Sequence, residues 1–553
     1  MEINWSQDKV VYQIYPKSFQ DTDHNGFGDL AGVIQRLDYL QFLGVDIIWL
    51  TPIYPSPQID NGYDISDYYT IDPLYGSMED FERLVQQAHL RNIRIMMDMV
   101  FNHTSTQHPW FIQACDPTSQ FHPFYIWHEA SEKGLPTNWL SKFGGSAWQW
   151  QEDAGKYYLH LFSPQQADLN WEHPPVRQAI KDICQFWAAK GVDAFRLDVI
   201  NLISKPAEFV DDPNGDGRQF YTDGPKVHQY LQELSREVFQ PLGLITVGEM
   251  SSTTLSHCQH YAARDHRELT MAFNFHHLKV DYPQGNKWRL ARPNFVELKQ
   301  IINYWQQGMH QRANTALFWG NHDQPRVVSR FGEDRHYRVV SAKMLAMVLY
   351  GMQGTPFIFQ GEEIGMTNAG FTDISHYRDI ESLSFYTEQG NRGIPTAESL
   401  AILATKSRDN SRTPMQWDEG VYAGFSHTAP WICLNPNYRQ INVADAIADP
   451  DSILHTYRAL IRLRKQCEVI QLGDYTDLLP EHPEIWCYLR RWNNQLLLVV
   501  ANLTSLCVDW SPPTSVPDSP YQLLWANYPT VTNYPTAGRL KPYQAAWWLC
   551  TED

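Results

Sequence analysis

The segment that decides the fold is Gly191-Val192-Asp193-Ala194-Phe195-Arg196-Leu197-Asp198-Val199-Ile200. Its apolar and β-branched residues predict a buried strand, and two opposite charges, Arg196 and Asp198, stand at its carboxyl end. Side chains alternate along a strand with a period of two, so these charges share one face. Because a buried charge is costly unless it is paired, the segment indicates either a structural ion pair or a functional site.

Similar segments recur along the chain, and most precede a stretch with the helical spacing of apolar residues. Alternating strands and helices predict an α/β fold with a parallel sheet, and eight such units indicate a closed (β/α)8 TIM barrel. An open doubly wound sheet is the alternative, but no Gly-x-Gly-x-x-Gly motif opens a helix, which weakens its nucleotide-binding form. The expected strands are residues 10–15, 45–50, 93–100, 191–200, 244–247, 269–275, 315–319 and 355–359, with helices near 33–43, 81–88 and 176–187.

Three parts are predicted along the chain. Residues 1–103 and 173–466 form the catalytic barrel, residues 104–172 an inserted subdomain that walls the active site, and residues 467–553 a C-terminal β-sandwich domain. The insertion has little helical periodicity, whereas the last part has short alternating strands between Pro-rich turns. Residues 364–450 form another long excursion, after the eighth strand, and long loops in compact domains are usually functional.

The composition of the chain limits the kinds of molecule that it is expected to bind. The chain has 553 residues and a net charge of −18, which disfavours nucleic acid or an anionic membrane surface. We see neither a signal-peptide pattern nor an apolar run long enough to span a bilayer. The eight cysteines show no metal-binding spacing and are interpreted as reduced. We therefore expect a cytoplasmic protein that acts on a small molecule.

Polar side chains stand where the predicted barrel strands end. Active residues of such barrels gather at the carboxyl ends of the strands, so these groups would converge on one rim. Carboxylate pairs cleave glycosidic bonds, one attacking carbon and the other protonating the leaving oxygen. No serine nucleophile elbow, His-Glu-x-x-His motif or Walker loop indicates a competing chemistry. The groups are Asn102-His103, Arg196, Asp198, Glu249 and Asn321-His322-Asp323.

Four segments resemble, in order and spacing, the signature regions of glycoside hydrolase family 13, the α-amylase family. They are residues 98–103, 191–198, 247–249 and 321–323. The resemblance covers nearly the whole chain. It implies that Asp198 is the nucleophile, that Glu249 is the general acid/base, and that Asp323 is a third carboxylate that binds sugar hydroxyls.

Elementary electrostatics adds to these implied roles. Arg196 beside Asp198 should keep the nucleophile ionised at neutral pH. Glu249 faces two other carboxylates, which should raise its pKa and keep it protonated. By the resemblance, His103 and His322 donate hydrogen bonds to hydroxyls of the sugar being cleaved. A satisfied core histidine is the alternative for each.

Residues 60–64 and 407–417 resemble the exo-acting α-glucosidase branch of the family. That resemblance implies that Asp60 pairs with Arg412 to close the pocket, and that Tyr63 offers a stacking face. The alternative for the two charges is a surface salt bridge. A closed end means that one glucose is removed at a time, so long polysaccharides would be poor substrates.

The linkage is indicated by three further features. Val199 follows the expected nucleophile, and by resemblance this residue disfavours α-1,4 linkages. Residues 271–289 and 354–368 resemble those of the branch that hydrolyses trehalose 6-phosphate. A phosphate dianion needs two or more cationic donors, which Lys279 and Lys287 could supply. From charge alone, a solvated lysine pair on a loop is the more ordinary interpretation.

The resemblance therefore implies a retaining exo-acting α-glucosidase that hydrolyses trehalose 6-phosphate, a phosphorylated disaccharide, to glucose and glucose 6-phosphate. No organic cofactor is expected. An oligo-1,6-glucosidase acting on isomaltose-type substrates, or a trehalose-isomerising relative, is the alternative within the family. A non-catalytic barrel that serves a transporter is disfavoured, because such a chain would usually lack one of the carboxylates and carry a membrane segment.

Residues 21–29 form a candidate calcium loop. Oxygen donors at alternate positions, with glycines for the tight turn, follow the logic of calcium ligation. Such an ion would stabilise the fold rather than take part in catalysis, and a metal-free Asn-Gly turn is the alternative. The expected ligands are Asp21, Asp23, Asn25, the Phe27 carbonyl and Asp29.

Overall fold

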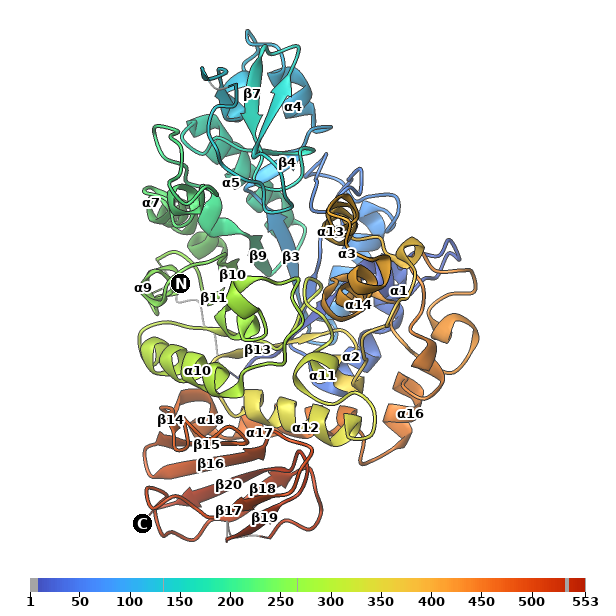
Figure 1. Ribbon diagram of the computed structural model, residues 1–553, viewed down its shortest axis with the longest axis vertical. Coiled ribbons are helices and arrows are strands. Elements are labelled where there is room, and N and C mark those ends of the chain that lie inside the picture. Colours follow the sequence, from blue (N-terminus) through green and yellow to red (C-terminus); the bar gives the residue numbers. More distant parts are fainter. Residues whose placement is uncertain (1–7, 133, 266, 533–536, 553) are drawn as a thin grey trace.

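The centre of the molecule is a barrel of eight parallel strands (Figure 1). The structure is a computed structural model that describes residues 8–132, 134–265, 267–532 and 537–552. The strands pair in the order β11-β10-β9-β3-β2-β1-β13-β12, and a parallel bridge from Ala272 to Thr315 joins the two ends. The predicted (β/α)8 barrel is confirmed. Its strands are β1 (Val11–Ile14), β2 (Ile47–Leu50), β3 (Arg94–Val100), β9 (Ala194–Asp198), β10 (Ile245–Glu249), β11 (Met271–Phe273), β12 (Ala316–Leu317) and β13 (Thr355–Phe359).

Strand β9, the middle of the segment quoted first, is buried along its whole length. Its register places Arg196 between Asp98 of β3 and Val247 of β10. Phe195 packs outward, with its ring centroid 6.4 Å from that of Phe239. The alternation of the strand therefore turns Arg196 and Asp198 to the opposite side, toward the inside of the barrel.

Helices cover the outside of the barrel. α3 begins at Ser77, whose side chain forms a capping box with Asp80. The single helix expected over residues 33–43 is two helices, because Arg36 leaves the helical backbone with φ −101° and ψ 6°. The helices of this layer are α1 (Leu30–Gln35), α2 (Leu37–Leu43), α3 (Met78–His89), α5 (Pro174–Ala189), α7 (Val227–Leu234), α8 (Gln240–Leu242), α9 (Leu255–Tyr261), α10 (Phe295–Met309), α11 (Val327–Phe331) and α12 (Arg338–Tyr350). Within the described residues, no helix combines the length and apolarity needed to cross a membrane.

Between β3 and α5 the chain forms a separate lobe, seen at the top of Figure 1. A two-stranded ladder at its base pairs His103 with Asp168. The apolar core of the lobe contains Trp139 and extends to Val199 and Leu202, which follow β9. The lobe is thus packed directly beside the end of the central strand. Its elements are β4 (His103–Ser105), α4 (Pro109–Ala114), β5 (Trp127–His128), β6 (Trp148–Gln151), β7 (Lys156–Leu159) and β8 (Gln166–Asp168).

The excursion after β13 brings α15, a buried single turn, back to the barrel. The guanidinium of Arg326 donates to the carbonyl oxygens of Asn410 and Ser411 at 3.3 and 3.0 Å, and it also donates to the carbonyl of Gln360 just after β13. These bonds fix α15 against the barrel end. The helices from here to the last domain are α13 (Ile380–Asn391), α14 (Thr396–Lys406), α15 (Asp409–Arg412), α16 (Val443–Ala448), α17 (Ile453–Gln466) and α18 (Glu468–Leu472).

The C-terminal part is an antiparallel sheet with a smaller two-stranded ladder. One face of the sheet packs on α12: Tyr488 donates to the Val348 carbonyl at 2.7 Å, and Trp547 donates to the Met347 carbonyl at 3.0 Å. A second apolar core lies on the other face. The sheet contains β14 (Thr476–Asp477), β15 (Ile485–Trp492), β16 (Gln495–Asn502), β18 (Gln522–Ala526) and β20 (Ala545–Thr551), and the ladder contains β17 (Val508–Trp510) and β19 (Gly538–Leu540).

Candidate active site

Charged side chains from separate strands meet at the carboxyl end of the barrel. β3 supplies Asp98, β9 supplies Arg196 and Asp198, β10 supplies Glu249, and the segment after β12 supplies Asp323. Asp198 and Asp323 both lie close enough to Glu249 to raise its pKa. The structure therefore brings the three carboxylates expected from the sequence onto one rim.

Arg196 is the centre of this group. Its Nη1 donates to Asp98 Oδ1 at 2.8 Å and to Asp198 Oδ1 at 2.6 Å, while its Nη2 donates to Glu249. The side chain is 1% exposed, and its guanidinium carbon lies 5.0 Å from the centre of the Trp49 ring. A buried charge needs this full set of partners, and in return the guanidinium holds the carboxylates in fixed positions.

Asp198 and Glu249 differ in protonation. Burial raises the pKa of Glu249 to about 8, with Arg196 opposing the rise and Asp198 adding to it. Burial also raises the pKa of Asp198 to about 6, although Arg196 lowers it. The sequence argument considered Arg196 and did not weigh burial, which has the larger effect. Asp198 is nevertheless ionised at pH 7, while Glu249 keeps its proton.

Asp323 is surrounded by donors. Its Oδ1 lies 3.0 Å from Arg408 Nη1 and 2.8 Å from Arg412 Nη2, and His322 Nε2 lies 3.3 Å from its Oδ2. Although burial alone would raise it, His322 and the guanidinium groups hold the pKa of Asp323 well below its usual range. This carboxylate is therefore anionic throughout the neutral pH range.

The expected pairing of Asp60 with Arg412 is wrong. Asp60 Oδ1 lies 3.3 Å from Arg408 Nη2, whereas Arg412 donates to Asp323 at 2.8 Å and to the His322 carbonyl at 2.9 Å. The two arginines stand four residues apart, one helical turn, so both face the pocket. The sequence pattern does not tell which of them reaches Asp60. Asp60 therefore does have a guanidinium partner, which is Arg408, and burial raises the pKa of Asp60 to about 7.

The His322 ring is held so that its Nε2–H can donate a hydrogen bond. Its ring stacks on Tyr63, with centroids 5.2 Å apart and planes at 4°, and Tyr63 in turn donates to Asp98 at 2.9 Å. Burial lowers the pKa of His322 to about 3, so the ring is neutral. Its Nδ1 lies 2.7 Å from the Gln13 amide nitrogen, a donor, which places the ring proton on Nε2. That Nε2 is buried without a hydrogen-bond partner among the described residues, as is Nη1 of Arg412.

His103 has a different environment. Its Nε2 lies 3.1 Å from the Tyr63 carbonyl, and its Nδ1 lies 3.2 Å from the Asn102 side chain. Burial lowers the pKa of His103 to about 4. Both ring nitrogens thus have protein partners, so a sugar hydroxyl would have to compete with the Tyr63 carbonyl for the ring.

The two expected phosphate lysines are not equivalent. Lys287 Nζ lies 2.5 Å from Glu381 Oε2, which neutralises it. Lys279 ends the short helix η5 (His276–Lys279) and has no carboxylate within 4.0 Å in the described part of the chain. Loss of solvent around its ammonium group and the charge of Arg218 lower the pKa of Lys279. Of these two lysines, only Lys279 has a charge that no neighbouring carboxylate compensates.

Two members of the site were not singled out from the sequence. Asp98 accepts from Trp49, Tyr63 and Arg196, and it is a charge inside the apolar run of β3. The argument applied to β9, that a charge in a buried strand needs a reason, would have found it. Arg408 could have been found by its spacing of one helical turn from Arg412.

Val199, the residue after Asp198, has a strained backbone. Its φ of 36° and ψ of 39° lie in the left-handed region, which β-branched residues rarely adopt. Its N–H points to Glu249 Oε2 at 3.4 Å, and its side chain joins the core of the inserted lobe. The strained turn therefore connects the position of Asp198 to that of Glu249.

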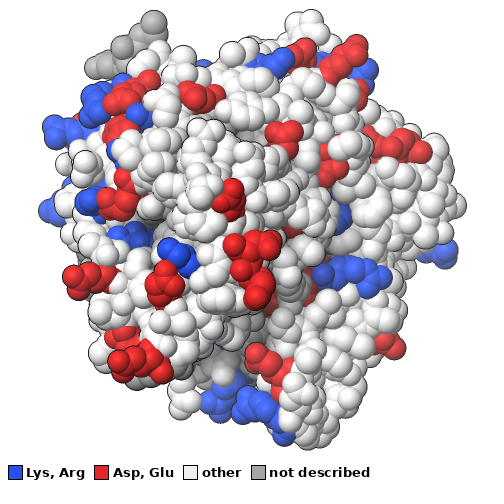
Figure 2. Space-filling view, turned by 90° about the horizontal axis from the view of Figure 1, so that it is seen from above, with Lys and Arg blue, Asp and Glu red and all other residues white. Residues whose placement is uncertain are grey.

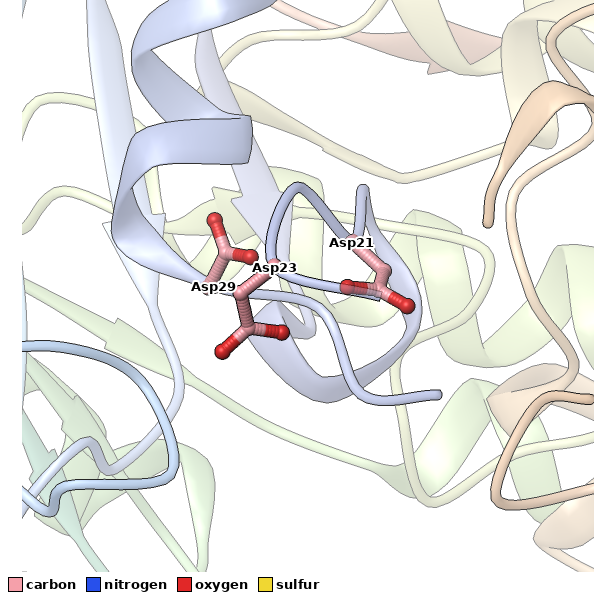
Figure 3. A group of neighbouring side chains, drawn as sticks. All are labelled: Asp21, Asp23 and Asp29. Carbon is pink, nitrogen blue, oxygen red and sulfur yellow. The ribbon is translucent and has the colours of Figure 1, made fainter. Parts of the chain in front are cut away.

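The candidate calcium loop brings three carboxylates together (Figure 3). Asp21, Asp23 and Asp29 each offer an oxygen, and these oxygens lie within 4.8 Å of one another. Calcium–oxygen distances of about 2.4 Å allow that spacing around one ion. Asn25 Nδ2 donates to Asp23 at 2.9 Å, and its Oδ1 accepts the Phe27 N–H at 2.8 Å. The carboxylates fit the predicted ion, while ligation by Asn25 and the Phe27 carbonyl remains a prediction.

The surface around the barrel end carries both signs of charge. Figure 2, seen from above the view of Figure 1, shows Lys and Arg scattered among Asp and Glu, with no broad basic region. A basic site for an anionic substrate would therefore have to be local.

Comparisons of the sequence and of the structure with known proteins point to the same family. Residues 13–473 match the family model described as the α-amylase catalytic domain. Trehalose-6-phosphate hydrolase of Escherichia coli (strain K12) is 59% identical over 546 residues, which cover 99% of each chain. The crystal structure of trehalose-6-phosphate hydrolase of Bacillus licheniformis superposes with a TM-score of 0.96 at 50% identity, covering 99% of this chain and 100% of that one. An oligo-1,6-glucosidase of Halalkalibacterium halodurans is 46% identical over 99% of each chain.

Proposed function

Because the chain belongs to the α-amylase family and is a glycoside hydrolase, we propose that it hydrolyses trehalose 6-phosphate to glucose and glucose 6-phosphate. The observation that carries the choice of substrate is the 59% identity over nearly the full length to a trehalose-6-phosphate hydrolase, against 46% to an oligo-1,6-glucosidase. The chemistry is supported by the rim around Arg196, where an ionised and a protonated carboxyl group stand side by side.

In the first step, a carboxylate oxygen of Asp198 attacks the anomeric carbon of the unphosphorylated glucose. The bond from that carbon to the bridging oxygen breaks, and its electron pair stays on the oxygen, which takes the proton of Glu249. Glucose 6-phosphate leaves and a glucosyl ester of Asp198 remains. Arg196 donates to both carboxyl groups and so holds them close together, which favours this double displacement over attack by a water held between them.

In the second step, Glu249, now ionised, removes a proton from water. The water oxygen attacks the anomeric carbon and the ester bond to Asp198 breaks, which restores both carboxyl groups and releases glucose with its original configuration. Asp323 stabilises the positive charge that develops on the sugar in both steps, since its neighbours keep it anionic.

Two buried donors of the pocket for the terminal glucose form no well-aligned hydrogen bond within the described residues. His322 Nε2 lies 3.3 Å from Asp323 Oδ2 and Arg412 Nη1 lies 3.8 Å from Asp379 Oδ1, so sugar hydroxyls would satisfy both donors better. The ion pair of Asp60 and Arg408 closes the far end, which limits cleavage to one terminal glucose. Tyr63 offers its ring as a stacking face.

A substrate panel tests this proposal. We expect kcat/KM for trehalose 6-phosphate to exceed that for trehalose and for isomaltose by at least about 100-fold, since a charged phosphate contact contributes 1.5–3 kcal/mol per hydrogen bond. Release of glucose 6-phosphate and glucose would be followed by coupled assays. A preference for isomaltose would instead assign the chain to the oligo-1,6-glucosidases.

The pH profile follows from the two raised pKa values. With trehalose, which does not titrate in this range and whose leaving oxygen needs a proton, kcat/KM should fall below about pH 6, where Asp198 becomes protonated, and above about pH 8, where Glu249 loses its proton. The maximum should lie near pH 7. Glu249→Gln should abolish the alkaline limb, whereas an unchanged limb in that variant would remove Glu249 from the role of acid.

We propose further that Asp21, Asp23 and Asp29 hold one Ca²⁺ with Asn25 and the Phe27 carbonyl. The spacing of the carboxylates supports this set. Bound there, the ion stabilises the loop between β1 and α1 and takes no part in the reaction.

Removal of the ion should lower thermal stability. A ligand at 100 times its Kd contributes about 2.7 kcal/mol, so a chelator should lower the Tm by a few degrees, and added Ca²⁺ should restore it. Asp23→Asn should remove this dependence, while Asp116→Asn, an exposed aspartate elsewhere, should keep it. Identical melting curves of the native chain with chelator and with Ca²⁺ would exclude the ion.

We propose a cytoplasmic location and, as partner, the phosphorylated disaccharide rather than a nucleic acid or a membrane. The eight free cysteines support a reducing compartment.

A further inference from the structure

The inserted lobe sends one lysine toward the catalytic rim. Lys142 Nζ donates to Ser251 Oγ at 3.1 Å, and Ser251 stands two residues after Glu249. The lysine lies in a fixed loop, because its backbone N–H donates to the Leu161 carbonyl at 2.9 Å. Lys142 therefore lies beside the segment that directly follows Glu249, the residue proposed to protonate the leaving group.

Two more cations belong to the same place. The Lys142 ammonium lies 5.5 Å from the centre of the Tyr221 ring, and Arg218 belongs to the same short helix as Tyr221, α6 (Arg218–Tyr221). Lys279 ends η5, and its charge and that of Arg218 both act on Lys142. Three separate segments thus place Lys142, Arg218 and Lys279 around the residues that follow Glu249; this set is called the cation cluster below.

The cation cluster lacks counter-charges. No carboxylate lies within 4.0 Å of Lys142 or Lys279 in the described ranges, and Arg218 has only the half-exposed Asp216 at 3.3 Å. Elsewhere near the rim, Lys287 is paired with Glu381 and Lys205 with Asp168, while the buried Lys17 has the side-chain oxygens of Gln58 and Asn61 as acceptors.

The cations also repel one another. Burial has the largest effect on the pKa of Lys142, and together with the charges of Arg218 and Lys279 it lowers that pKa to about 7. Such an arrangement is unfavourable alone and becomes favourable when a dianion binds in its midst, because the anion pairs with all three charges at once. Because the protein has a net charge of −18, a cation cluster without counter-charges beside the catalytic acid indicates a site for an anion.

We propose that Lys142, Arg218 and Lys279 form the phosphate subsite for the leaving glucose 6-phosphate, with Lys142 as its anchor and Lys287 outside it. This inference rests on the proposed function and assigns its substrate specificity to particular residues. Lys142 and Arg218 come from the inserted lobe and from the loop after β9, so specificity for the phosphate depends on segments outside the barrel strands. A substrate without the phosphate still binds in the glucose pocket, but it leaves the three cations without a counter-charge.

The test compares two substrates in one variant. Lys142→Met keeps the aliphatic chain over Tyr221 and removes the charge. We expect kcat/KM for trehalose 6-phosphate to fall about 10- to 100-fold, the effect of one charged hydrogen bond, and kcat/KM for p-nitrophenyl α-glucoside to change less than about threefold. Lys156→Met, in the same lobe and paired with Glu129, is the matched control and should leave both values unchanged. Equal losses with both substrates, or no loss with either, overturn the subsite.

A second measurement tests the phosphate subsite if Lys142→Met does not fold. Arg218→Gln and Lys279→Gln each change a more exposed side chain, and each should weaken inhibition by glucose 6-phosphate about 10-fold while inhibition by glucose stays the same. Unchanged inhibition by glucose 6-phosphate in both variants excludes the cluster. If the native enzyme prefers isomaltose to trehalose 6-phosphate, the proposed function fails; if it prefers trehalose 6-phosphate but these variants behave like it, only the subsite fails.

Discussion

Asp198→Asn is expected to lower kcat for trehalose 6-phosphate by about 10⁴-fold or more, the scale of loss when a nucleophile is removed. An amide does not form the glucosyl ester, and no other ionised carboxylate of the rim replaces it. Asp98 is held by Arg196, Trp49 and Tyr63, and Asp323 is held by Arg408 and Arg412. The amide also retains the shape of the carboxylate, so substrate binding should persist. Steady-state kinetics and a binding titration with trehalose 6-phosphate measure the two effects separately.

Azide distinguishes loss of a nucleophile from loss of structure. It should restore cleavage of p-nitrophenyl α-glucoside by Asp198→Gly and produce β-glucosyl azide, because the small anion attacks the anomeric carbon from the space that the carboxylate occupied. Asp193→Asn, at the other end of the same segment, is the matched control and should lose less than about threefold. Formation of the α-azide by Asp198→Gly would assign the attacking role to a different residue.

Glu249→Gln is expected to lower kcat/KM for trehalose 6-phosphate by about 10³-fold, within the usual range for a lost general acid. The bridging oxygen of a disaccharide is a poor leaving group without a proton. p-Nitrophenolate leaves without one, so the first step with the aryl glucoside should fall far less, and a burst of p-nitrophenol should precede slow hydrolysis of the ester. Rapid-mixing absorbance measurements record the burst.

The second role of Glu249 has its own outcome. With Glu249→Gln, azide should accelerate turnover of the aryl glucoside and give α-glucosyl azide, since it replaces water at the ester and needs no base. Equal losses with the disaccharide and the aryl glucoside, with no burst, would contradict the assignment of Glu249 as the acid. The native-like Tm of the variant is the control for folding, because glutamine still accepts from Arg196.

The barrel and its rim followed from local patterns in the sequence. Apolar runs with the period of a strand, alternating with runs of helical period, depend on residues that are neighbours along the chain, so eight strands were found near their true positions. Charges at strand ends, such as Arg196 and Asp198, were informative because burial makes an unexplained charge costly. The break between α1 and α2 was missed, because the apolar spacing continues through Arg36 while the backbone does not.

By itself, then, the sequence determined the succession of the barrel strands, the family and three of the rim carboxylates, Asp198, Glu249 and Asp323. Only the tertiary structure showed Asp98 beside Arg196 and decided the partners of the other charges: Arg408 rather than Arg412 for Asp60, and Glu381 for Lys287. It also showed how strongly burial raises the pKa of Asp198. The physical reason is that pairing and desolvation depend on distances between groups hundreds of residues apart in sequence. Local periodicity specifies which face a side chain lies on, and it carries no information about what stands opposite.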